Sequence, residues 1–106
     1  NIVFTGFLGY ILYSIEVSNA AWVTVYSSTA AETADSGRSI NVDPTPNSGV
    51  IAEVITTGAL KTFFSPAVIG YSSESPPDTN IPVKVYNNGA GSAAITVTLT
   101  LVKIES

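Results

Sequence analysis

Residues 80–105 read NIPVKVYNNGAGSAAITVTLTLVKIE, and two runs within this stretch decide the fold class. In residues 81–86 and again in residues 95–101, every second residue is apolar. A period of two is typical of a β-strand with one buried face and one solvated face. The connecting residues 87–92 tolerate positive φ and tight chain reversal. We therefore expect a β-hairpin that packs against a second sheet, because an isolated hairpin is only marginally stable in water.

Five segments upstream of this stretch also have the features of β-strands. They are residues 10–17, 21–27, 50–57, 60–65 and 67–71, separated by turn-forming residues. We expect the first two to form an antiparallel hairpin. Residues 50–57 are apolar on both faces, which favours a central position in a sheet or a position beneath a covering loop. Pro66 is expected to separate the last two segments, because proline cannot donate to a strand ladder.

Alternation also predicts which side chains of the first two strands share a face. In residues 10–18 one face carries Ile11, Tyr13, Ile15 and Val17, and the other carries Tyr10, Leu12, Ser14, Glu16 and Ser18. In residues 21–26 one face carries Trp22, Thr24 and Tyr26, and the other carries Ala21, Val23 and Val25.

A short helical segment interrupts the strands. Thr29 and Glu32 have the spacing of a capping box, alanines favour helix after them, and Gly37 stands where a helix-terminating glycine belongs. The sequence predicts one or two helical turns over residues 30–36. Residues 39–49 and 72–79 are rich in Pro, Ser and Asn, so we expect loops there that project outward and make contacts.

These segments predict an all-β protein: an antiparallel β-sandwich or jelly roll of about seven to eight strands, with one short helical turn in a loop. We expect residues 10–106 to form this domain. Residues 1–9 are strongly apolar and are expected to pack on a neighbouring subunit or on an upstream part of the protein. The chain begins with Asn1 rather than Met, which is compatible with a trimmed chain or a piece of a longer one.

The composition argues against most enzyme and nucleic-acid functions. The 106 residues include no Cys, His or Met, so the chain has no thiol nucleophile and lacks the commonest general base and metal ligand. Its net charge is −4, and its four basic residues are scattered along the sequence, which does not favour phosphate binding. Charged residues make up only 11% of the chain. We expect part of this weakly charged surface to be covered in an assembly.

Carboxylates are the remaining candidates for chemistry. Glu16, Glu53 and Glu74 could supply the acid and base of a glycosidase only if the fold set two of them across a cleft. Glu32 and Asp35 could be calcium ligands, but their spacing in a capped turn favours a helix-capping and dipole role. The sequence therefore predicts no catalytic, cofactor-binding or metal-binding residues and no cofactor.

Four aromatic residues are candidates for ligand contact: Trp22, Tyr26, Tyr71 and Tyr86. An exposed, flat ring on a sandwich can stack on a sugar. Residue type alone favours core or sheet-face packing for Trp22 and Tyr26.

Four segments in order carry a family resemblance: AAWVTVYSSTAAETADSGR (20–38), DPTPNSGVIAEVITTG (43–58), SPAVIGY (65–71) and the stretch quoted first (80–105). This ordered set resembles β-sandwich domains in structural proteins of tailed bacteriophages, particularly cyanophages. The resemblance implies a non-enzymatic virion component of the tail, fibre or capsid surface, extracellular when mature. It also implies a homo-oligomer, such as a trimer, in contact with other virion proteins.

Two alternatives remain open at this point. The chain could be a carbohydrate-binding module or a host-surface adhesion module, with a host glycan as ligand. We expect neither nucleic-acid binding nor membrane insertion.

Overall fold

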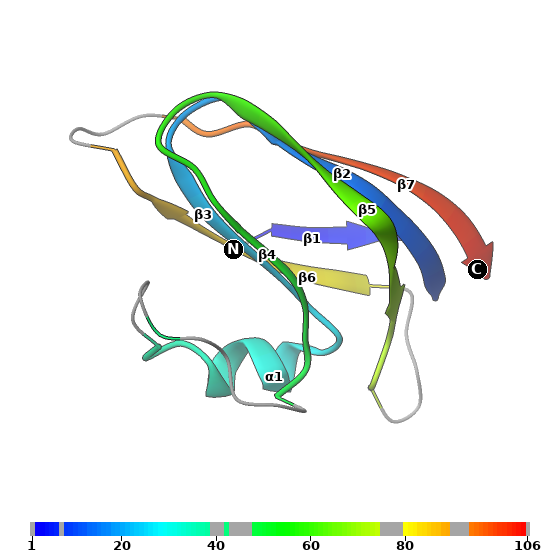
Figure 1. Ribbon diagram of the computed structural model, residues 1–106. Coiled ribbons are helices and arrows are strands. Elements are labelled where there is room, and N and C mark those ends of the chain that lie inside the picture. Colours follow the sequence, from blue (N-terminus) through cyan, green and yellow to red (C-terminus); the bar gives the residue numbers. More distant parts are fainter. Residues whose placement is uncertain are drawn as a thin grey trace.

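The computed structural model describes residues 2–6, 8–38, 42, 48–74, 80–89 and 94–105. Within these residues the chain forms a two-layer antiparallel β-sandwich, as the sequence predicted (Figure 1). The elements are β1 (Ile2–Thr5), β2 (Gly9–Val17), β3 (Ala21–Tyr26), α1 (Thr29–Ala34), β4 (Val50–Ile55), β5 (Leu60–Tyr71), β6 (Asn80–Asn87) and β7 (Val97–Glu105). The expectations for Phe7 and for residues 39–41, 43–47, 75–79 and 90–93 lie outside the described residues.

The seven strands divide between two sheets. Sheet A has the order β1-β6-β3-β4, and sheet B has the order β5-β2-β7. Every paired neighbour is antiparallel. The chain changes sheet at five of its six strand-to-strand steps, so most neighbours in sequence face each other across the core.

Both predicted hairpins are wrong for this reason. β6 pairs with β1 and β3, whereas β7 pairs with β2 in the other sheet. β2 and β3 likewise lie in different sheets. Alternation identifies which face of a strand is buried, but two strands can bury those faces side by side or across the core. A crossover sets the apolar face of β2 directly against that of β3.

A bulge in β2 changes the predicted facing of its first half. The pairing of β2 with both neighbours shifts between Leu12 and Ser14. As a result Tyr10 and Leu12 are buried together with Ile15 and Val17, and Tyr13 is exposed. An extra residue in one strand reverses the period of two, and the alternation alone does not reveal it.

Two further expectations for single strands need correction. β5 is one continuous strand through Pro66, and its irregular stretch lies opposite the β2 bulge. An edge strand tolerates proline because one side of it has no ladder to serve. β4 is an edge strand of sheet A rather than a central one, so of its two expected positions the one beneath a covering loop is confirmed. Its Ala52 and Val54 join the core, while its other face is covered by the segment that follows α1.

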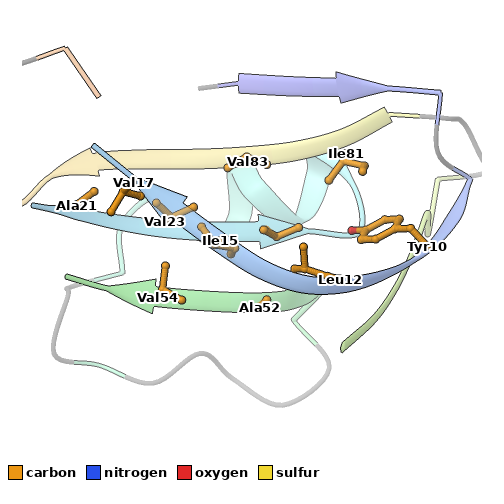
Figure 2. Packing of buried hydrophobic residues seen from close by; sticks show 11 residues of the cluster. Tyr10, Leu12, Ile15, Val17, Ala21, Val23, Ala52, Val54, Ile81 and Val83 are labelled. Atoms are coloured by element: carbon orange, nitrogen blue, oxygen red, sulfur yellow. The ribbon is translucent and has the colours of Figure 1, made fainter. Parts of the chain in front are cut away.

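The core lies between the two sheets (Figure 2). Its largest contribution comes from β2, whose buried side chains point toward β3, β4 and β6. The cluster comprises Tyr10, Leu12, Ile15, Val17, Ala21, Val23, Val25, Ala52, Val54, Ile81 and Val83. On β7, Val97, Leu99 and Leu101 pack against this core and the alternating threonines are exposed, as predicted.

The N-terminal segment and the helix differ from their predictions in detail. Residues 2–5, for which the sequence predicted packing outside the domain, form β1 at the edge of sheet A, and Phe4 packs against the core. α1 begins one residue earlier than expected. Ser28, not Thr29, is the N-cap, and its hydroxyl accepts from the Ala31 amide.

Candidate functional site

The four candidate aromatic residues divide into two buried and two exposed side chains. Trp22 is 4% exposed and Tyr26 is 0% exposed, whereas Tyr71 is 55% and Tyr86 is 59% exposed. Trp22 and Tyr86 are register partners in sheet A, and their rings meet edge to face with centroids 5.9 Å apart. Tyr71 lies at the end of β5 in the other sheet. The fold therefore does not bring the four rings together into one platform, and the two buried rings present no face to solvent.

Cations cover the rings of Trp22 and Tyr26 on the outer face of sheet A. The Arg38 guanidinium carbon lies 5.3 Å from the Trp22 ring centroid. The Lys84 ammonium lies 4.9 Å from the same ring and 5.9 Å from that of Tyr26. Such contacts are attractive because the face of an aromatic ring is electronegative.

Two carboxylates complete this outer layer, which we call the Arg38 cluster: Trp22, Thr24, Tyr26, Asp35, Arg38, Glu53 and Lys84. Arg38 Nε donates to Asp35 Oδ1 over 2.8 Å, and its Nη2 donates to Asp35 and to Glu53. Glu53 also accepts from Trp22 Nε1 at 2.6 Å and from Thr24 at 3.1 Å. The Tyr26 hydroxyl donates to Asp35 Oδ2 over 2.6 Å. The charges of its two carboxylates and its two basic groups therefore cancel, and the cluster is neutral overall.

The cluster shifts the protonation of its members. The hydrogen bond from Arg38 holds the pKa of Asp35 below its ordinary value. Burial alone would raise the pKa of Glu53, but hydrogen bonds from Arg38 and Trp22 outweigh it and leave that pKa low. The hydrogen bonds that Arg38 donates, first to Asp35 and then to Glu53, raise the pKa of Arg38 itself. Both carboxylates are therefore ionised at neutral pH, and each accepts several hydrogen bonds, which suits a structural role rather than proton transfer.

Sequence reasoning missed this cluster, although a signal existed. Glu53 interrupts the apolar run of β4, and Lys84 interrupts that of β6. A charge inside an apolar strand needs a partner when it is buried. The strand register places Glu53 and Lys84 on either side of Thr24. Arg38, in the segment after α1, lies over them and bonds Glu53.

The three candidate catalytic carboxylates do not share a cleft. Glu16 is exposed on β2 of sheet B, and Glu53 belongs to the Arg38 cluster on sheet A. Glu74 accepts from the amide and hydroxyl of Thr29 at the start of α1. Glu32 lies in the first turn of α1 and Asp35 is its C-cap residue, which fits the helix-capping role that the sequence favoured for this pair.

The outer face of sheet B is unlike that of sheet A. Apolar side chains from all three of its strands are exposed there, and we call them the apolar outer face: Phe63 (69% exposed), Ile69 (68%), Tyr71 (55%), Tyr13 (42%), Val102 (50%), Ile104 (57%) and the half-buried Ile11. In register, Ile69 and Val102 flank Ile11 on either side. Monomeric proteins seldom expose so continuous an apolar surface unless it is used in binding.

A small hydroxyl-lined pocket of about 320 Å³ lies where the loop after β3 meets the loop after β5. Ser27, Ser28, Ser48 and Ser73 line it together with Ala31, Gly49 and Tyr71. The hydroxyls of Ser27 and Ser73 are 2.7 Å apart and bond each other. The pocket therefore combines polar groups with one exposed aromatic ring.

Within the part of the chain that the structure describes, no three Asp or Glu side chains gather in a way that could hold a metal ion. Among those same residues, no helix has the length and apolar character needed to cross a membrane. No protein-family model, curated protein or solved structure matches this chain.

Proposed function

We propose that this chain is a non-enzymatic structural component of a tailed-phage virion, of the tail, fibre or capsid-surface type. Its mechanism is oligomeric assembly of β-sandwiches, with copies of itself and other virion proteins as partners. It is carried on the virion and is extracellular when mature.

The observation that carries this proposal is the contrast between the two outer faces. The outer face of sheet A is covered over Trp22 and Tyr26 by the chain's own Arg38 cluster, and among the described residues only Ile55 and Tyr86 at one end of it are exposed apolar residues. The outer face of sheet B leaves seven apolar side chains on three strands without such a cover from the described residues. An interface that is kept for the life of a particle is typically apolar in this way. The phage origin is supported by the ordered sequence segments that resemble cyanophage β-sandwich domains.

The test of this role uses particles of the phage that encodes the chain. Mass spectrometry of purified virions should find the protein in fixed stoichiometry, and hydrogen exchange of particles should show stronger protection of β2, β5 and β7 than in the isolated chain. Particles that lack the protein, or that leave those strands as unprotected as in solution, would refute the role.

A second candidate, glycan binding, is favoured by the hydroxyl-lined pocket beside Tyr71. Serine hydroxyls can exchange hydrogen bonds with a sugar while an exposed tyrosine ring stacks on its apolar face. A glycan array should then give a signal that Tyr71→Ala abolishes. The matched control is Tyr86→Ala, which removes an equally exposed tyrosine from sheet A. An array without signal would remove this candidate.

A further inference from the structure

We propose that the apolar outer face of sheet B is the contact between two copies of this chain, packed face to face. The two copies are related by a twofold axis that lies between them, parallel to β2. The inference rests on the proposed assembly role and adds the partner and the geometry.

The size of the face fits this occupant. Aromatic side chains bury about 150–250 Å² each when fully covered, so the exposed parts of Phe63, Tyr71 and Tyr13, with the aliphatic residues beside them, amount to about 500 Å² of apolar surface. A stable interface buries roughly 800 Å² on each partner, of which about 60% is apolar. The patch therefore supplies the apolar area that one side of an ordinary dimer requires.

The charges on this face also favour an identical partner. Glu16 and Lys61 are register partners at one end of the sheet, and the Lys61 ammonium lies 5.2 Å from the Phe63 ring centroid. One acid and one base leave this end without net charge. A strongly acidic or basic partner gains nothing here. In the dimer each Glu16 lies opposite the Glu16 of the other copy, and the Lys61 in register with each of them balances its charge, so this end of the interface has no net charge.

The two edge strands are complementary in shape over the middle of the face. There Phe63 and Ile69 make the β5 side bulky, while Thr100 and Val102 make the β7 side lower; towards Gly9, Tyr71 and Ile104 are both large. A twofold axis along β2 lays β5 of one copy over β7 of the other. Because Ile69 and Val102 both pair with Ile11, and Phe63 and Thr100 both pair with Ser14, large side chains then meet small ones at the same level.

The resulting dimer has four layers of β-sheet, with the two copies of sheet B on the inside. Face-to-face sheets pack about 10 Å apart with nearly aligned strands. The Arg38 clusters remain on the outside of the dimer. A twofold arrangement of this kind is the commonest form of homo-oligomer.

The first experiment measures association by sedimentation equilibrium. The unmodified chain should be a dimer, and Ile69→Lys should weaken the dimer by about 100-fold or more, because each dimer would bury the new charge twice. The matched control is Ile55→Lys, which places a lysine at a half-exposed isoleucine of sheet A and should leave the dimer intact. Circular dichroism of both variants at concentrations where they are monomeric should give the spectrum of the folded chain.

A chain that stays monomeric at millimolar concentration would overturn the proposal, as would a trimer or an Ile69→Lys variant that dimerises like its parent. None of these results touches the virion assignment, which the particle experiment decides separately.

The second experiment tests the axis and exploits the absence of cysteine from the chain. Lys61→Cys copies are mixed with Thr98→Cys copies and treated with a bis-maleimide of about 10 Å reach, the spacing of packed sheets. The proposed axis brings Lys61 of one copy over Thr98 of the other, so the mixture should cross-link more than either variant alone. A dimer that forms without this cross-link would overturn the axis.

Discussion

Arg38 joins three parts of the outer layer, because its guanidinium bonds Asp35 after α1, Glu53 on β4 and the main-chain oxygen of Val42. Its side chain is only 7% exposed, and that of Asp35 is 8% exposed. Replacing it by an apolar residue leaves two largely buried carboxylates without their main partner.

We therefore expect Arg38→Met to lower the free energy of unfolding by about 3 kcal/mol or more. Urea denaturation of the monomer measures this change in the free energy of unfolding. Lys61→Met removes an exposed cation instead and should change the same quantity by no more than about 0.5 kcal/mol. Equal effects of the two substitutions would show that the Arg38 cluster does not fasten the layer.

Gly70 holds a position that the sequence did not single out. It is the register partner of Tyr10, and a Cβ at Gly70 would overlap the buried Tyr10 ring. Gly70→Ala should therefore destabilise the fold by about 1–3 kcal/mol through overpacking. Gly58→Ala is the control, because a Cβ there would meet no atom within 4 Å. Thermal unfolding of both variants compares them, and an unchanged midpoint for Gly70→Ala would contradict the tight packing of this ring.

At the scale of elements, α1 depends on contacts with both of the loops that flank it in space. Ser28 caps its first turn, and Glu74 from the loop after β5 accepts from Thr29. Its first turn also contains Glu32, an acidic residue where the helix dipole favours one. A helix of six residues has no independent stability, so these contacts hold it in place.

Ser28→Ala should accordingly cost about 1 kcal/mol of unfolding free energy. Thr33→Ala, an exposed change within the same helix, should cost little or nothing. Chemical denaturation compares the two variants. If Thr33→Ala proved the more harmful, Ser28 would not be the N-cap.

At the scale of the whole molecule, titration of buried groups sets the pH range in which the sandwich is stable. The pKa values of Asp35 and Glu53 are lowered from ordinary values of 3.8 and 4.5, so in acid the unfolded chain binds more protons than the folded one. Their stabilising contribution is complete above about pH 5 and is lost as the pH falls further. Burial raises the pKa of Tyr10 and Tyr26 above the ordinary 10.0, so stability should also fall above about pH 10.

Urea midpoints measured across this pH range should form a plateau between about pH 5 and 10 with a decline on each side. Arg38→Met should show a shallower acid decline, because without the guanidinium the carboxylates keep pKa values closer to those of the unfolded chain. If the urea midpoint declined equally steeply in acid for both proteins, the acid sensitivity would come from groups outside the Arg38 cluster.

Strand existence and the identity of most buried side chains were predictable, because a period of two is a local property of consecutive residues. The alternation of residues 95–101 correctly placed Val97, Leu99 and Leu101 inward and the threonines outward. Alternation failed at Tyr13, where a bulge reversed the period of two. The capping pattern failed at Ser28, because Thr29 fitted it equally well one residue later.

The sequence by itself determined that this chain makes strands, which residues could be buried, and that it lacks thiol and imidazole chemistry. Only the tertiary structure decided the pairing of strands into two sheets, because burial energy does not distinguish neighbours within a sheet from neighbours across the core. It alone brought Asp35 and Arg38 after α1, Glu53 on β4 and Lys84 on β6 together from three separate segments. It also decided that one outer face is largely covered by the chain itself and the other is left apolar, since that difference depends on where the loops lie in space.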